Sequence, residues 1–441
     1  MLSARKRTTA ALALVLSGVL LASGCSSKSA SKTADGTTGG SGGGGAQVTL
    51  KVGLFGTFGY KEAGLYDQYM KLHPNIKIVE DSVEDEGKYY PALLTHLSAG
   101  SGLDDIQGIE VGRIADVDQN LSSKFVDLNS LGAASLKSNF YPAKWAAATT
   151  SDGKVMGLGT DYGPLAMCYR TDLFKAAGLP TDSASVSALW PDWASYIKTG
   201  LDYKAKAPAN QAFVDTAGGI FNAIVGQSAN QYYDSSGKQI ADSNPAIKNA
   251  WDTAMQLSTQ GLTAKLSQFS TAWNQAFTTG SFATIACPAW MTGYIKSEAG
   301  AMTGLWGVAK IPGGTGDWGG AYLGIPTASK HQKEAYDLIS WLTAPDQQKT
   351  MFTNGGHFPS SEAAAKDPAI AAHTDPYFGD SPIGQIYSDS AASIPQAVLG
   401  AKDGTIKDLI SKAITRVEAQ GQKPDDSWNK AMSDIKSASS G

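Results

Sequence analysis

Residues 48–79 read VTLKVGLFGTFGYKEAGLYDQYMKLHPNIKIV, and this stretch decides the fold class. Apolar residues alternate over residues 48–55, which predicts a β-strand. Residues 61–73 place apolar side chains at helical spacing, and Pro74 ends that helix. Residues 76–79 are again β-forming. The order strand, helix, strand predicts an α/β fold with mostly parallel sheets.

The same alternation continues along the rest of the chain. Length supports two domains, because about 395 residues follow the N-terminal segments and exceed what a single core usually holds. No internal repeat is evident. Further helices are predicted around residues 89–97, 172–177, 245–257, 333–342, 406–417 and 427–435, and a strand is predicted over residues 106–111.

The N-terminus has the features of an export signal. Arg5, Lys6 and Arg7 precede an apolar run over residues 10–22, about a dozen residues, which is too short to span a bilayer. Small residues then lead to Cys25, a pattern similar to a lipobox, although the leucine stands four rather than three positions before the cysteine. We expect residues 1–24 to be a lipoprotein signal peptide and Cys25 to carry the lipid. An ordinary signal peptide with an incidental cysteine is the alternative.

Residues 25–46 are expected to form the lipid-attachment site and a flexible tether. After Cys25 this segment consists mainly of Ser, Gly, Thr and Lys, which cannot bury enough apolar surface to order the chain. Of the 36 basic residues three lie in the signal, so the remainder carries seven more acidic than basic residues. A mildly acidic protein of this kind is not expected to bind nucleic acid or an anionic membrane surface.

The two other cysteines leave their state open. Cys168 and Cys287 each lie inside an apolar, strand-like run. Outside the cell such a pair can form a disulfide. Two buried free thiols that pack as small apolar side chains are the alternative.

The sequence carries no clear catalytic or metal-binding motif. Its five histidines show no metal-ligand spacing such as HExxH. The run Gly313–Gly316 lacks the Lys-Ser/Thr of a phosphate loop and predicts a turn. The acidic residues between Glu80 and Glu86 are typical of a solvated surface. A carboxylate pair at glycosidase separation stays open, but no pair stands out, so we expect no metal, no cofactor and no enzymatic activity.

Aromatic residues in polar loops are the distinctive feature. Trp290 follows a strand between Pro and Gly, and Trp318 lies in the sequence GDWGG. Phe58 and Tyr60 follow the first strand in a Gly-rich loop, and Phe358 follows the sequence GGH. A pyranose has an apolar C–H face and a polar rim, so flat rings beside carboxylates and amides suit it. In α/β folds the loops at strand ends are where ligands bind.

Some candidates have a competing structural interpretation. Trp273 shares a helical face with Phe277, so it could equally pack in the core. Glu110 and Asp161 stand at strand ends, where they could accept sugar hydroxyls or act as caps and surface residues. Trp306 lies inside a strand pattern and is expected in the core.

Three segments resemble one known family. They are AFTTG at 276–280 with ATI at 283–285 and PAW at 288–290; LISWLT at 338–343 with PDQQ at 345–348 and GGHFPS at 355–360; and YRTDLF at 169–174 with AGLP at 177–180. Together they resemble the extracellular solute-binding proteins of carbohydrate ABC importers, the maltose-binding-protein-like family. The resemblance extends over essentially the whole mature chain.

A closer likeness is to the cellobiose- and cello-oligosaccharide-binding lipoproteins of Gram-positive bacteria. It rests on FGTFGYK at 55–61, DIQGIEVG at 105–112, GLGTD at 157–161 and WGG at 318–320. This implies a β-1,4-linked glucose oligomer, most simply cellobiose or cellotriose. Xylo-, manno- and chito-oligosaccharides stay open.

The resemblance also implies an organisation and partners. Lobe I would comprise residues 47–158 and 322–358, and lobe II residues 159–321 and 359–441, with the sugar in a cleft between them. The closed form would be recognised by the permease subunits of an importer, and the protein would be a monomer anchored by lipid at the outer face of the cell membrane. The two alternatives are a secreted glycoside hydrolase and a surface adhesin for insoluble polysaccharide. The candidate ligand residues are Phe58, Tyr60, Glu110, Asp161, Tyr162, Trp273, Trp290, Trp318, Tyr322, His357, Phe358 and Tyr387, the last placed by the resemblance alone.

Overall fold

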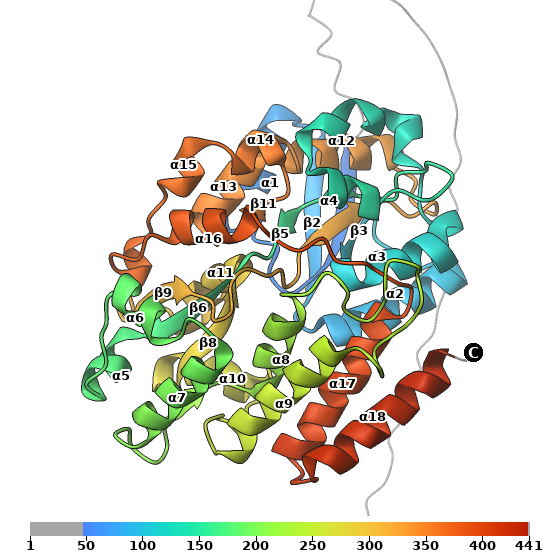
Figure 1. Cartoon of the computed structure of the whole chain (residues 1–441). Helices are drawn as coiled ribbons and strands as arrows, with labels where there is room; N and C mark the ends of the chain where they lie inside the picture. The colour runs from blue at the N-terminus through green and yellow to red at the C-terminus, as the bar shows by residue number, and fades with distance from the viewer. Residues whose placement is uncertain (1–46, 440–441) are drawn as a thin grey trace, which may run out of the picture. The chain divides into compact units, whose positions relative to one another are not determined.

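A computed structural model describes residues 47–439 (Figure 1). The predicted signal peptide, Cys25 and the whole predicted tether lie outside the described residues. Within residues 47–439, none of the helices combines the length and the apolar character needed to cross a bilayer.

The first sheet has five strands in the order β2-β1-β3-β10-β4. Strand β1 pairs in parallel with β2 and β3, whereas β10 pairs antiparallel with β3 and β4. The first strand, helix and second strand form as the sequence predicts. The bounds are β1 Val48–Phe55, β2 Ile76–Val83, β3 Ile106–Glu110, β4 Leu158–Gly159 and β10 Ala321–Gly324, with helices α1 Leu65–Leu72, α2 Glu86–Ala99, α3 Val111–Asp116, α4 Pro142–Ala147, α12 Gln332–Leu342 and α13 Pro345–Gly355 around them.

The second sheet has four strands in the order β7-β8-β6-β9. Strand β6 pairs antiparallel with both β8 and β9, and only β7 and β8 run parallel. The expectation of mostly parallel sheets was therefore wrong, because hydrophobic periodicity reports burial and not strand direction. The bounds are β6 Leu165–Arg170, β7 Ala212–Val214, β8 Phe282–Pro288 and β9 Trp306–Lys310.

Helices surround the second sheet, with α17 and α18 packed side by side beyond α8 and α9 (Figure 1). The predicted start of α9 is present: Pro245 occupies its first turn and the Asn244 side chain accepts from Ala246 N at 3.0 Å. The bounds are α5 Thr171–Ala176, α6 Ser183–Leu189, α7 Trp193–Lys204, α8 Ala217–Val225, α9 Pro245–Thr259, α10 Thr271–Thr279, α11 Ala289–Ala299, α15 Pro368–Ala371, α16 Ile383–Ala391, α17 Asp403–Glu418 and α18 Pro424–Ser439. Helix α14, Glu362–Ala365, packs on α13 and on β11 (Phe358–Pro359).

The chain passes between the two sheets close to a small antiparallel pair. Strand β5, Asp161–Tyr162, pairs with β11, Phe358–Pro359. The segment from β4 to β6 runs from the first sheet to the second, and residues 311–320 return from β9 to β10. Each sheet has its own apolar cores. The fold is therefore α/β with two lobes joined by crossing segments, as predicted.

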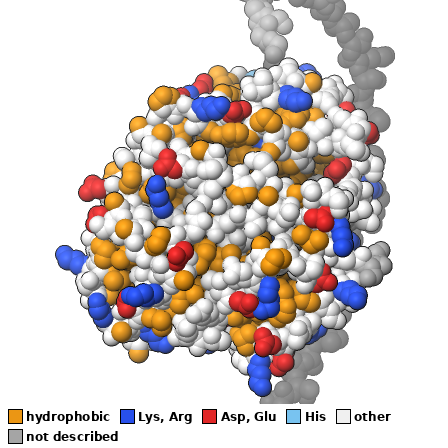
Figure 2. Space-filling model, in the orientation of Figure 1, with side chains coloured by type: hydrophobic (Ala, Val, Ile, Leu, Met, Phe, Trp, Pro, Cys, Tyr) orange, Lys and Arg blue, Asp and Glu red, His pale blue; other side chains and the backbone are white. Residues whose placement is uncertain are grey.

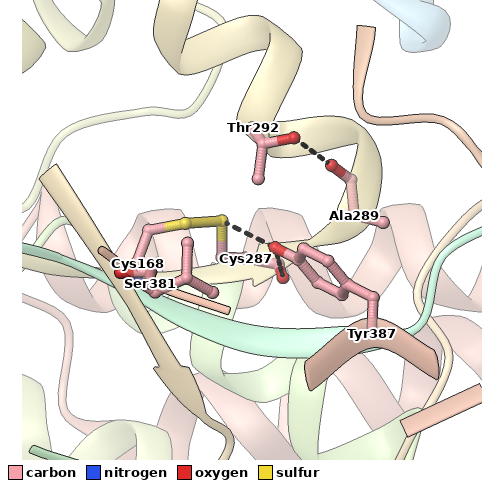
Figure 3. Close-up of a disulfide and its surroundings, with 7 residues drawn as sticks. Cys168, Cys287, Ala289, Thr292, Ser381 and Tyr387 are labelled. Atoms are coloured by element: carbon pink, nitrogen blue, oxygen red, sulfur yellow. Dashed lines mark hydrogen bonds between the residues drawn. A yellow bond between two sulfur atoms is a disulfide. The ribbon is translucent and has the colours of Figure 1, made fainter. Parts of the chain in front are cut away.

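Strands β6 and β8 are joined by a disulfide (Figure 3). Cys168 and Cys287 are fully buried, and their Cα atoms lie 5.4 Å apart across 119 residues of sequence. Figure 3 shows the Tyr387 ring beside this bridge, with its hydroxyl 3.2 Å from the Cys287 carbonyl oxygen. The disulfide therefore cross-links the two central strands of the second sheet.

Candidate functional site

A cavity of about 590 Å³ lies between the two lobes, a volume within the range of small-molecule sites. Both lobes contribute side chains, and the chemistry is mixed: flat rings alternate with carboxylates, amides and lysines. The first lobe supplies Phe55, Phe58, Tyr60, Glu84, Asp85, Glu86 and Glu110, and the second supplies Asn222, Gln268, Phe269, Trp290, Tyr294, Lys407, Asp408 and Glu418, among others.

Phe58 and Tyr60 reach the cavity from the loop after β1. The backbone turns through Gly56 and Gly59 at φ 54° and 77°, values that favour glycine. Phe58 meets Phe55 edge-on at 5.2 Å and lies 6.1 Å from Tyr60. Both predicted rings line the cavity although they are largely buried.

Glu110 ends β3 and has two roles. One carboxylate oxygen accepts from Gly112 N at 2.6 Å and caps α3. The other lies 3.5 Å from Lys407 Nζ on α17 in the second lobe. Glu110 also lines the cavity. It therefore lies where a ligand contact was predicted and at the same time serves as the helix cap that was the alternative.

Trp290 lies where β8 passes into α11 and is half-buried at the cavity wall. Its indole N–H donates to the Trp318 carbonyl oxygen at 2.9 Å, and the two rings meet edge-on at 5.9 Å. A Cβ on Gly319, whose φ is 96°, would come within 2.8 Å of Trp290 Nε1. The glycine beside Trp318 thus permits the contact that fixes the Trp290 ring.

Asp161 and His357 line the cavity beside the crossing segments. Asp161 accepts from Thr160 Oγ1 at 2.6 Å and from Ala321 N at 3.0 Å, and its other oxygen lies 3.6 Å from His357 Nδ1. Burial alone would raise the pKa of Asp161, but the contact with His357 and the positive charge of Lys144 outweigh it and lower the pKa. Asp161 is therefore an ionised acceptor.

Four predicted ligand residues lie outside the cavity lining and are buried, which corrects their placement. Trp273 packs in the core and donates from Nε1 to Asp215 at 2.9 Å. Tyr322 is enclosed in β10, and Phe358 packs edge-on against Phe352 at 5.4 Å. Tyr387 packs against the disulfide. For Trp273 this is the core packing beside Phe277 that the sequence left open. For the other three, packing between distant segments buries the ring, which local polarity did not indicate.

Tyr162 is half-buried and also lies outside the lining. Its ring meets Tyr141 edge-on at 5.5 Å and has Lys144 Nζ 5.2 Å from its centre. It belongs to the packing around the crossing segments.

Several lining residues were not anticipated. Glu84, Asp85 and Glu86 were expected on a solvated surface; Glu84 is exposed and the other two are partly exposed, and all three also line the cavity. The charged face of α17 and the turn at residues 265–269 also line it. The only hint in the sequence was polar composition, which surface segments share.

The lobes touch directly beside the cavity. Arg113 of the first lobe lies 3.1 Å from Glu86 and 2.9 Å from Asp408 on α17. Glu84 accepts from Asn274 at 2.9 Å and from Tyr294 at 3.0 Å, both in the second lobe. The Arg113–Asp408 ion pair and the two hydrogen bonds of Glu84 therefore connect the two walls of the cavity in this structure.

Charges on the outer surface are dispersed. Figure 2 shows basic and acidic side chains of both signs scattered over the visible face, with apolar areas between them. This face offers no extended basic surface of the kind that nucleic acid requires.

Behind the cavity wall, Asp215 gives a pH-dependent stability prediction. The side chain is fully buried, and burial raises its pKa to about 7 although Trp273 and Gln268 donate to it. Between pH 4 and 7 the native state keeps a proton that the unfolded state has lost, so this group's contribution to stability falls as the pH rises. Relative to the wild type, Asp215→Asn should gain roughly 2 kcal/mol in unfolding free energy between pH 5 and 7. Urea titrations of both proteins at pH 5 and pH 7 measure their unfolding free energies. If the free-energy difference between Asp215→Asn and the wild type is the same at both pH values, the prediction is contradicted.

Comparison with known proteins gives the family. The family model of the bacterial extracellular solute-binding proteins matches residues 64–377, well over half of the chain. A crystal structure described as an extracellular solute-binding protein of family 1 shares 41% identity with a TM-score of 0.73, covering 89% of this chain and 99% of its own.

Curated relatives are more distant. The lactose-binding protein of Rhizobium radiobacter is 25% identical over 74% of this chain and 81% of its own length. The arabinooligosaccharide-binding protein of Bacillus subtilis is 22% identical over 98% of this chain and 99% of its own. These relatives and the family confirm the prediction of a binding protein rather than an enzyme. The chain belongs to the bacterial extracellular solute-binding proteins.

Proposed function

We propose that this protein captures an oligosaccharide outside the cell and delivers it to the permease subunits of an ABC importer. The observation that carries the proposal is the cavity between the lobes, where aromatic rings and carboxylates from both lobes lie side by side. Rings suit the apolar faces of pyranoses and carboxylates suit their hydroxyls. The names of the lactose- and arabinooligosaccharide-binding relatives support a sugar as the ligand.

Within that class, a β-1,4-linked glucose oligomer such as cellobiose or cellotriose is the ligand we propose. The support is the likeness of residues 55–61, 105–112, 157–161 and 318–320 to cello-oligosaccharide-binding lipoproteins. All four stretches contribute lining residues or the backbone next to them. The relatives' names show that sugar preference varies in this family, so xylo-, manno- and chito-oligosaccharides are the comparison ligands.

Seven predicted residues are proposed as ligand contacts because they line the cavity: Phe58, Tyr60, Glu110, Asp161, Trp290, Trp318 and His357. A sugar that touches both lobes makes more contacts when they are together, so it stabilises the closed state. The permease would recognise that state. We also propose that a lipid on Cys25 attaches the protein to the outer face of the cell membrane and that the protein is a monomer.

Isothermal titration calorimetry with cellobiose, cellotriose, xylobiose, mannobiose, chitobiose and lactose tests the function. We expect one site per chain, with the tightest binding for cellobiose or cellotriose, and no shortening of cellotriose on prolonged incubation. Failure of every sugar to bind would contradict the sugar-binding function. Release of shorter sugars well beyond one equivalent would instead indicate a glycoside hydrolase.

A further inference from the structure

The turn Lys265–Phe269, between α9 and α10, has an unusual backbone. Lys265 and Phe269 adopt φ values of 56° and 63°, and they are the only residues other than glycine with positive φ in residues 47–439. The left-handed region is unfavourable for such side chains, most of all for a bulky one. All five residues of the turn line the cavity. Two strained residues in one short turn at a ligand cavity indicate a constraint imposed by function.

Asp215 holds this turn from behind. One carboxylate oxygen accepts from Gln268 Nε2 at 3.0 Å and from Trp273 Nε1 at 2.9 Å, so residues on either side of Phe269 are tied to the same atom. Leu266 N donates to the Asp215 carbonyl oxygen at 3.4 Å. A Cβ on Gly219 would come within 2.8 Å of Gln268 Nε2, so this glycine leaves space for the amide.

The turn presents the Phe269 ring to the same wall as Trp290. The two rings are near-parallel, with centres 6.4 Å apart and planes at 26°. Tyr294 meets Phe269 edge-on at 5.7 Å, and Trp273 supports it at 5.2 Å. Phe269 is only half-buried, unlike Trp273. The second lobe therefore offers two neighbouring flat rings to the cavity.

We propose that Phe269 is a ligand-stacking and specificity-determining residue, and that Asp215 is the positioning residue that keeps it in its strained conformation. Because two rings present a longer apolar surface than one, the pair favours an oligosaccharide over a single monosaccharide. Trp273 contributes indirectly, by fixing Asp215 and by supporting the Phe269 ring. This inference rests on the proposed sugar-binding function.

The test measures binding by the wild type and four variants with glucose and with each of the six sugars named above. Phe269→Ala should bind the tightest-binding oligosaccharide of the panel at least tenfold more weakly than the wild type does. Phe269→Tyr keeps a flat ring, so its affinity should stay within threefold of the wild type. The ratio of oligosaccharide to glucose affinity should fall in Phe269→Ala, which a merely structural role would not cause.

The Asp215 pair tests positioning. Asp215→Asn can still accept both donors through its amide oxygen and should bind within twofold of the wild type, whereas Asp215→Ala should lose at least fivefold. Circular dichroism checks that each variant is folded. If Asp215→Ala does not fold, Phe269→Ala still tests the inference. Phe269 is only half-buried, so its removal leaves no closed cavity in the core and the variant should fold.

The outcomes separate the two proposals. A wild type that binds none of the sugars overturns the function, and this inference with it. A wild type that binds while Phe269→Ala binds equally well, with an unchanged preference over glucose, overturns this inference alone.

Discussion

Replacing Trp290 by alanine is expected to weaken oligosaccharide binding about 100-fold, equivalent to roughly 3 kcal/mol. The half-buried indole lies at the cavity wall and is fixed by its hydrogen bond to the Trp318 carbonyl oxygen. Alanine removes both the flat surface for stacking and most of the apolar area that a sugar would cover. Calorimetry with cellotriose and cellobiose measures the change.

Trp428→Ala is the matched control. Trp428 is also half-buried and packs against Trp251 with ring centres 5.3 Å apart, but it lies on α18 and outside the cavity lining. It should lower the melting temperature without changing sugar affinity. Equal affinity of Trp290→Ala and the wild type would remove Trp290 from the binding site.

Removing the disulfide with Cys168→Ala and Cys287→Ala together is expected to lower the unfolding free energy by about 4 kcal/mol. The bridge closes a loop of more than a hundred residues, and cross-links of this length restrict the unfolded chain strongly. Both sulfurs are fully buried, so loss of packing adds to the effect. Urea denaturation of the double variant and the wild type gives the difference.

Alkylation of the denatured wild type without reductant provides the companion check. Mass spectrometry of the two cysteine-containing peptides should find Cys168 and Cys287 unmodified and linked to each other. Alkylation of both would show free thiols, the alternative that the sequence left open, and the stability loss should then be much smaller.

Local structure was predictable because it depends on neighbouring residues. The alternation at residues 48–55 and the apolar spacing of the next helix are confirmed as β1 and α1. Asn244 and Pro245 set the start of α9 for local reasons of capping and fixed φ. Trp290 was predicted as a ligand contact because it follows a strand and lies between Pro288 and Gly293; the structure places it in the first turn of α11 at the cavity wall.

Strand direction and the far wall of the cavity depend on contacts between distant parts of the chain. Strands β6 and β8 are antiparallel although both are buried along their whole length, as a parallel strand would also be. Arg113 meets Asp408 across 295 residues, and nothing near Asp408 indicates that α17 returns to the cavity.

Burial of single aromatic residues has the same origin. Trp273 and Phe269 are four residues apart. Trp273 is buried in the core, where it donates a hydrogen bond to Asp215, whereas Phe269 lines the cavity. The sequence left Trp273 open between ligand contact and core packing and did not single out Phe269, whose left-handed backbone belongs to a turn held by contacts with the distant Asp215.

A crystal structure of the protein grown with saturating cellotriose tests the central claim most directly. The account predicts one saccharide between the lobes, with a pyranose face against Trp290 and hydroxyls on Glu110 or Asp161. A saccharide bound on the outer surface, or an empty interlobe cavity in crystals of a protein that calorimetry shows to be saturated, would contradict it.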